Sequence, residues 1–356
     1  MGELPVSARR SVPKVQGRSR VAVRIALDAM GGDLAPEAPV RAAVMAVERR
    51  RGELEVLLVG PAAETAAALA AAGGERAGIR LVPSGPGVPE GGRPALWMRH
   101  HPDNSVQMAA RLAGQGEADA AVAMGHTGGC LIAAAWEMGL LPGVERPAPA
   151  VAFAFAPDMT FLDAGANPDA SAEELVQFAR MGVAYARAQF AIEAPTVALL
   201  SNGAERGKGS RIVQAAHELL RASGLRFVGN CEGGDLVHRP ADVVVTDGFT
   251  GNCVLKAIEG MAAYMGERLR AVLPATLPER GSILESLGLL DDATQSGAPV
   301  ALLGVDGVFV PGHGRSSAAA IADTLIRTER IVRSGFRDGL RTALAEAARR
   351  EGATTA

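Results

Sequence analysis

Apolar runs along the chain end repeatedly in glycine-rich turns, and segments of helical periodicity follow most of them. The runs that predict strands lie at residues 25–29, 56–60, 78–83, 118–125, 150–156, 160–165, 196–203, 225–230 and 242–248. The segments that predict helices lie at 37–51, 106–113, around Trp136, and at 172–190, 210–222, 251–272 and 316–350, the last broken near Gly335. This alternation predicts an α/β fold, a three-layer α/β/α sandwich with a mostly parallel sheet.

Two places in this pattern predict antiparallel hairpins instead of crossovers. The strands at 150–156 and 160–165 are too close together for a helix to connect them. Residues 299–310 carry two apolar runs around Asp306-Gly307, a dipeptide that favours tight hairpin turns.

Polar side chains ahead of several helices predict N-caps. Ser171 followed by Glu174 has the spacing of a capping box, and residues 103–105 contain further capping side chains. Asp33 is expected to cap the helix at 37–51, although it is also placed to contact a ligand. Asp247 precedes the helix at 251–272 in the same way.

No Ser/Pro-rich linker divides the chain, so residues 23–350 predict one α/β/α domain, with 272–299 as its most loop-like part. Residues 1–24 carry six basic residues and one acid, without an apolar segment of leader length. We expect residues 1–22 to be a disordered basic extension. Attraction of this extension to anionic lipid is the alternative.

Composition narrows the class of protein. Of the 356 residues, 48% are hydrophobic but only 4% aromatic, which predicts a core of Ala, Val, Leu and Ile. A net charge of −3 does not favour nucleic-acid binding. Cys130, Cys231 and Cys253 are far apart and form no C-x-x-C motif, which is typical of reduced intracellular thiols. No apolar run approaches the roughly 20 residues of a membrane-spanning helix.

Six polar turns lie where strands end, and the carboxyl edge of a parallel sheet is where ligands bind. They are residues 28–33, 125–129, 163–169, 201–210, 247–252 and 312–317. Glycine admits an anion close to the backbone, and helix N-termini offer unpaired N–H groups. One such turn is ordinary in an α/β protein, but several along one edge predict an anion-binding site. The expected ligand-binding residues are Asp28, Gly31, Gly32, Asp33, Gly125, His126, Thr127, Gly128, Asn167, Gly203, His313, Gly314 and Ser316.

Lys208 lies in a glycine-rich loop that differs from a nucleotide-binding P-loop. Only three residues separate Gly203 from Gly207, and Gly209 stands where a magnesium-binding hydroxyl is needed. Lys208 is instead a candidate cation for phosphate or an oxyanion, a solvated lysine being the alternative. The chain has no G-x-S-x-G, H-E-x-x-H or G-x-G-x-x-G motif, and no histidine spacing predicts a metal site.

Several motifs in this order resemble one family over residues 23–335. They are ALDAMGGDLAP, GEADAAVAMGHTGG, LDAGANPDASAEELVQFARMG, GNCEGGD, VVVTDGFTGNCVLKAIEG and GHGRSS. The chain thereby resembles the phosphate acyltransferases of bacterial phospholipid synthesis (PlsX type). The resemblance implies a fold related to phosphotransacetylases and isopropylmalate dehydrogenases.

The resemblance also implies an activity. Such enzymes transfer an acyl chain from acyl carrier protein to inorganic phosphate, and the acyl phosphate goes on to a glycerol-3-phosphate acyltransferase. A cytoplasmic homodimer with peripheral membrane contact, and no cofactor, is implied. Lys208, Asp247 and Asn252 become the expected catalytic residues. Phosphate is itself the nucleophile, so the protein needs to hold the anion and stabilise the developing oxyanion.

The chain departs from the family pattern at its candidate ligand turns. The differing residues are His126, Ala204, Arg206, Ser210, Arg315 and the segment WMRHHP at 97–102. These departures leave two alternatives open: a phosphate acyltransferase that uses coenzyme A or another acyl donor, and an inactive acyl- or phosphate-binding scaffold. A dehydrogenase has the least support.

The segment 257–277 carries a helical stripe of Met261, Tyr264, Met265 and Leu269. A buried position in the core is the ordinary expectation for such a stripe. A protruding apolar surface that touches membrane or a partner subunit is the alternative.

Overall fold

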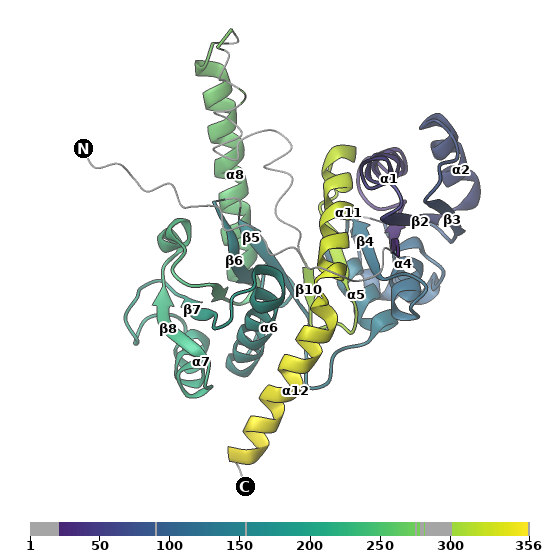
Figure 1. Ribbon diagram of the computed structural model, residues 1–356. Coiled ribbons are helices and arrows are strands. Elements are labelled where there is room, and N and C mark those ends of the chain that lie inside the picture. Colours follow the sequence, from purple (N-terminus) through teal and green to yellow (C-terminus); the bar gives the residue numbers. More distant parts are fainter. Residues whose placement is uncertain are drawn as a thin grey trace.

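Two β-sheets lie side by side in the protein, each covered by helices (Figure 1). The computed structural model describes residues 21–89, 91–153, 155–274, 276–277, 281 and 301–354. The sheets adjoin where β10 of the second sheet contacts β11 of the first. The expected α/β class, with α/β/α layers and mostly parallel strands, is confirmed.

The first sheet has the order β11-β4-β1-β2-β3, and all its strand pairs are parallel. Its strands are β1 (Val23–Asp28), β2 (Leu54–Gly60), β3 (Ile79–Pro83), β4 (Ala120–Met124) and β11 (Phe309–Gly312). Alternate side chains of β1 enter opposite layers: Ile25 and Leu27 pack in one hydrophobic cluster and Ala26 in another. Burial of both faces explains why the strand sequences are continuously apolar.

Helices cover both faces of the first sheet. One face is covered by α1 (Glu37–Arg49), α2 (Ala62–Ala71) and α11 (Ala318–Arg333), and the other by α3 (Pro94–His100), α4 (Ser105–Gly114) and α5 (Thr127–Met138). Arg50, at the end of α1, donates hydrogen bonds to the fully buried Glu329 of α11 and so ties the two helices together, and Arg333 of α11 also donates to Glu329.

The second sheet has the order β10-β5-β6-β9-β7-β8. Its strands are β5 (Ala148–Phe153), β6 (Ala156–Leu162), β7 (Thr196–Leu200), β8 (Arg226–Cys231), β9 (Val243–Val245) and β10 (Ala301–Leu303). The strands from β6 to β8 are parallel, whereas β5 is antiparallel to both β6 and β10. The expected hairpin at 150–165 is therefore confirmed.

Helices also flank the second sheet on two sides. One side holds α6 (Ala172–Phe190), α7 (Arg211–Ala222) and α12 (Phe336–Thr354), and the other holds α8 (Gly248–Val272) and the 3-10 helix Gly233–His238. The last two helices, α11 and α12, are separated at Gly335, which has a φ of 70°. The predicted break in the final helix is thus confirmed.

The hairpin predicted at 299–310 is wrong. β10 pairs with β5 in the second sheet, and β11 pairs with β4 in the first, so the two segments belong to different sheets. The Asp306 carboxylate accepts hydrogen bonds from Arg337 and Arg341 of α12. Asp306-Gly307 therefore lies in a connection between sheets, docked on a helix.

Three of the predicted caps are present and one is not. Ser171 and Glu174 form the capping box of α6, Asn104 accepts the Gln107 N–H at the start of α4, and Asp247 caps α8. The expected cap by Asp33 is wrong, because α1 begins after Pro36 and has no side-chain cap.

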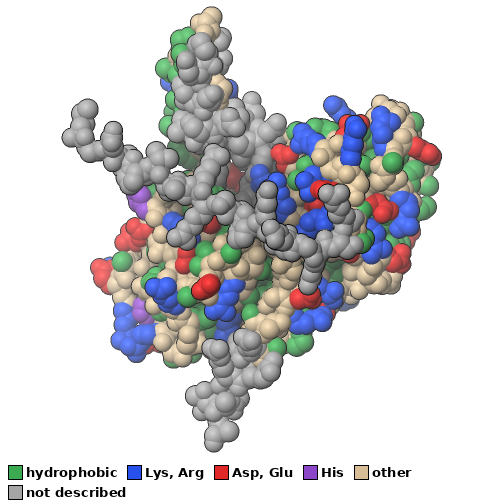
Figure 2. All heavy atoms as spheres, in the orientation of Figure 1, with side chains coloured by type: hydrophobic (Ala, Val, Ile, Leu, Met, Phe, Trp, Pro, Cys, Tyr) green, Lys and Arg blue, Asp and Glu red, His purple; other side chains and the backbone are tan. Residues whose placement is uncertain are grey.

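The distal part of α8 extends away from the rest of the protein (Figure 1). Met261, Tyr264 and Met265 are 60%, 55% and 43% exposed, so the expectation that this stripe is buried is wrong. Figure 2 shows hydrophobic side chains on this projecting part. Within the described residues, no helix has the length and apolar character needed to cross a membrane. Residues 1–20 of the predicted tail and most of the predicted loop 272–299 lie outside the described residues.

Candidate functional site

Three of the predicted turns meet at the carboxyl ends of β1, β4 and β11, which are neighbours in the first sheet. The Asp33 N–H donates to the Gly314 carbonyl at 2.8 Å, which joins the first turn to the third. Gly32 and Gly125 have φ values of 93° and 103°, in a region that favours glycine. A side chain on Gly31 would overlap the backbone of Met124. We name this edge, residues 28–33, 124–130 and 312–317, the first rim.

Residues 28–33 and 124–130 of the first rim line a pocket of about 240 Å³, and the turn 312–317 adjoins it through the bond from Asp33 to Gly314. Six predicted residues line it: Asp28, Gly31, Gly32, Asp33, Gly125 and His126. Val88, Val106 and Cys130 close its apolar side. The pocket therefore combines glycine backbone, one end of a helix and a buried carboxyl group.

Asp28 is the buried carboxyl group of this pocket, with only 2% of its surface exposed. Its Oδ1 accepts the Met30 N–H at 2.9 Å. Burial raises the pKa of Asp28 from 3.8 to about 6, against the opposing effect of its hydrogen bonds. Burial also raises the pKa of the neighbouring Cys130 thiol, and the Asp28 carboxylate adds to that rise. Cys130 therefore stays a protonated, packed thiol.

His126 caps helix α5, a role that sequence reasoning did not anticipate. Its Nδ1 accepts the Gly129 N–H at 3.2 Å, so the ring proton of the neutral side chain is on Nε2. Thr127 and Gly128 form the first turn of α5, where backbone N–H groups lack helical partners. The start of a twelve-residue helix at the pocket favours an anion there.

A second rim follows β6 and β9 of the second sheet, at residues 163–169 and 247–252. The buried Asp163 carboxylate accepts N–H groups of Gly165, Ala166 and Asn167 at 2.7–2.8 Å. Burial raises the pKa of Asp163, and these hydrogen bonds oppose the rise. The Asn167 side chain donates to the Pro147 carbonyl and to Asp163, so its nitrogen serves the fold of the turn.

Helix α8 begins at the second rim and is held there by close backbone packing. Asp247 accepts both the N–H and the hydroxyl of Thr250, at 2.8 and 2.7 Å. A side chain on Gly251 would overlap the Asp163 carbonyl oxygen. Asn252 is exposed beside Gly165, on the surface of this first helical turn.

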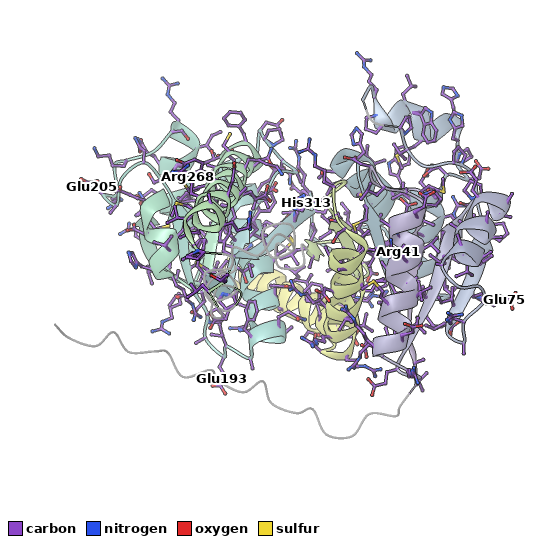
Figure 3. All side chains as sticks on the ribbon, turned by 90° about the horizontal axis from the view of Figure 1, so that it is seen from above. Arg41, Glu75, Glu193, Glu205, Arg268 and His313 are labelled. Atoms are coloured by element: carbon purple, nitrogen blue, oxygen red, sulfur yellow. The ribbon has the colours of Figure 1, made fainter. Side chains whose placement is uncertain are left out.

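Lys208 lies in the exposed loop that follows β7, next to Gly203. Strand β7 neighbours β9, so this loop continues the second rim. Figure 3 shows Glu205 of the same loop at the outer side of the second sheet, with α8 between it and His313. The structure thus brings Lys208 to the rim of Asp247 and Asn252, away from the pocket of the first rim.

His313 is the predicted residue through which the first rim contacts α8, the helix that begins at the second rim. Its Nε2 lies 3.5 Å from Glu259 Oε1 of α8, and Glu259 Oε2 accepts Lys256 Nζ at 2.8 Å. Sequence reasoning missed Lys256 and Glu259 because they lie inside a helical segment with no turn signal. Their spacing from Asn252, four and seven residues, places all three on one helix face.

The remaining predicted residues of the third turn support its shape. Ser316 is buried, and its N–H donates to the His313 carbonyl at 3.1 Å. Arg315 has a side chain 90% exposed, 4.0 Å from the Asp33 carboxylate. Within the described part of the chain, no group of three or more His, Cys, Asp or Glu side chains has the arrangement of a metal site.

Comparisons with known proteins agree with this geometry. Residues 23–338 match the family described as fatty acid synthesis protein. A phosphate acyltransferase of Thermus thermophilus is 44% identical over 322 residues, covering 88% of this chain and 96% of the relative. A phosphate acyltransferase of Salinibacter ruber is 40% identical over 316 residues, covering 85% and 92%.

The fold also has relatives among solved structures. The EutD phosphotransacetylase from Staphylococcus aureus aligns with a TM-score of 0.56 at 16% identity, covering 89% of this chain and 95% of that one. A phosphotransacetylase from Streptococcus pyogenes aligns with the same TM-score at 17% identity, covering 88% and 96%. At this identity the likeness concerns the fold.

Proposed function

Because the chain belongs to the fatty acid synthesis protein family, we propose that it is a phosphate acyltransferase that forms acyl phosphate from a thioester and inorganic phosphate. The structural observation that carries the proposal is the first rim. Two glycine turns, at residues 28–33 and 124–130, and the start of α5 line a pocket of about 240 Å³ that suits a small tetrahedral anion.

In this proposal phosphate binds to backbone N–H groups of the first rim. The bound anion raises the pKa of the buried Asp28 further, so that its carboxyl group stays protonated and donates to a phosphate oxygen. A phosphate oxygen then attacks the thioester carbonyl carbon. Asp247 holds the start of α8, while Asn252 and Lys208 on the second rim receive the thioester and its developing oxyanion.

The test uses purified protein, acyl-acyl carrier protein and radiolabelled phosphate. We expect phosphate-dependent loss of thioester and transfer of the label to a lipid-extractable product that neutral hydroxylamine destroys. Absence of label transfer from every donor, with tight phosphate binding, would favour the inactive scaffold. Lys208→Ala should lower the rate, and a wild-type rate in that variant contradicts its role.

For the donor, we propose acyl carrier protein, with acyl coenzyme A as the alternative. The support is the family description and the names of the relatives, which connect the chain to fatty acid synthesis and phosphate acyl transfer. Equal concentrations of both donors, compared by kcat/KM, distinguish them. A higher value for coenzyme A overturns the choice of carrier protein.

We further propose a cytoplasmic homodimer that touches the membrane and supplies a glycerol-3-phosphate acyltransferase. The support is the exposed apolar part of α8, which includes Met261, Tyr264 and Val272. Sedimentation measures the dimer, and flotation with anionic vesicles measures membrane contact. Replacement of Tyr264 and Met265 by Ser should weaken at least one of the two interactions.

A further inference from the structure

The contact between His313 and Glu259 connects the phosphate pocket to the helix that begins at the other rim. His313 follows β11, and the amide of Asp33, a pocket residue, bonds to the next residue, Gly314. Glu259 belongs to α8 and lies 3.5 Å from the imidazole. Lys256 holds the other carboxylate oxygen of Glu259 at 2.8 Å. The side chains His313, Glu259 and Lys256 therefore link the first rim to α8, the helix that begins at the second rim.

Both ends of this chain are firmly placed. Ser316 N–H donates to the His313 carbonyl, which fixes the turn that carries the imidazole. On the other side, α8 is anchored where Gly251 packs on the Asp163 carbonyl and Asp247 caps the helix. Rigid elements thus determine where the imidazole and the carboxylate meet, which is the condition for a side chain that transfers a proton.

Burial is the main effect that favours the neutral form of the imidazole. Burial lowers the pKa of His313, Glu259 opposes this effect and Lys256 adds to it. Arg315 and Asp33 are the other charged groups at this turn, and they lie 4.0 Å from each other. A neutral imidazole that directs its Nε2–H to Glu259 keeps Nδ1 as a proton acceptor.

The proposed reaction needs such an acceptor. Hydrogen phosphate carries one proton, and the phosphate oxygen forms the new C–O bond as the C–S bond breaks. The products are acyl phosphate and a thiol, so one proton passes from phosphate to sulfur. A neutral imidazole that takes the proton from the phosphate and returns it to the departing sulfur balances the reaction without another reactant.

We propose that His313 transfers this proton from phosphate to sulfur, an inference that rests on the proposed function. Glu259 and Lys256 are then positioning residues that orient the imidazole ring. His313 then contacts the reacting atoms, whereas Glu259 acts through the imidazole and Lys256 through Glu259. In this proposal the leaving thiolate receives its proton from His313, a residue of the first rim. Helix α8 contributes to catalysis by orienting the imidazole.

The experiment compares wild type with His313→Gln, Glu259→Gln and Glu259→Asp on two donors of the same acyl chain. One donor is acyl carrier protein, and the other is an aryl thioester, whose more acidic thiol leaves without a proton. We expect His313→Gln to lower kcat on the carrier protein by about 100-fold or more, and on the aryl thioester by less than about 10-fold. The KM for phosphate should change little.

Glu259→Gln should lower kcat by about 10-fold and move the acidic limb of its pH profile to lower pH, because the carboxylate favours the imidazolium. Glu259→Asp should restore part of kcat. The control is Glu267→Gln, the same substitution at an exposed position of the same helix, which should behave like wild type. Urea unfolding shows whether each variant is folded.

Equal losses on both donors, or an unchanged pH profile in Glu259→Gln, overturn the inference while leaving the proposed function intact. If wild type does not use the aryl thioester, the pH profile alone decides. If wild type makes no acyl phosphate from any donor, the proposed function fails, and the inference fails with it.

Discussion

Replacement of Asp28 by Asn should stabilise the protein, by an amount that depends on pH. In the folded protein burial raises the pKa of Asp28 to about 6 from 3.8. As pH rises, the unfolded chain therefore loses this proton before the folded protein does. The free energy of unfolding consequently falls between about pH 4 and 6. Above pH 6 the cost is complete, at about 3 kcal/mol for this separation of pKa values. Asn is neutral and avoids it.

The measurement is urea unfolding of both proteins at pH 7.5 and pH 5. We expect Asp28→Asn to exceed wild type in free energy of unfolding by about 3 kcal/mol at pH 7.5 and by about 1.5 kcal/mol at pH 5. Asp33→Asn is the matched control, because it removes a carboxylate from the same turn that is 46% exposed. The reasoning is refuted if Asp28→Asn is no more stable than wild type at pH 7.5. It is also refuted if the difference in free energy of unfolding between the two proteins is the same at both pH values.

Two further predictions concern packing. Gly251→Ala should lower the free energy of unfolding by about 1–3 kcal/mol, because the new methyl group overlaps the Asp163 carbonyl. Gly260→Ala, in open space on the same helix, should raise the free energy of unfolding by about 0.5–1 kcal/mol. Similar urea midpoints for the two variants would contradict this. Glu329→Gln should cost about 2 kcal/mol by weakening charged hydrogen bonds to Arg50, and calorimetry showing an unchanged Tm would count against it.

The sequence predicted well the turns and helix caps that depend on residues close together in the chain. The glycine turns at the ends of β1 and β4 and the cap at Asp247 depend on residues close together in the chain, so their patterns were readable. Asp33 was misread because the chain makes another turn, ending in Pro36, before α1 begins, and its backbone serves the contact with Gly314 instead. That contact spans about 280 residues and leaves no local signal.

Long-range pairing explains the other failures. Asp306-Gly307 has the local pattern of a hairpin, yet each flanking strand finds a better partner in a different sheet. Glu259 belongs to an ordinary helical pattern, and only its meeting with His313 distinguishes it. The roles of Lys208, Asn252 and the other expected site residues stay predictions, as does the single domain over 23–350.

The position of β11 has a consequence for synthesis on the ribosome. Strands β1 to β4 emerge early, but their sheet takes its edge strand, and the first rim its third turn, only after residue 317 has left the exit tunnel. Until then the nascent chain exposes an unpaired edge on β4, which is prone to pair with other chains. The first rim is thus completed only after β11 has emerged, and chains that end before β11 should accumulate as aggregates.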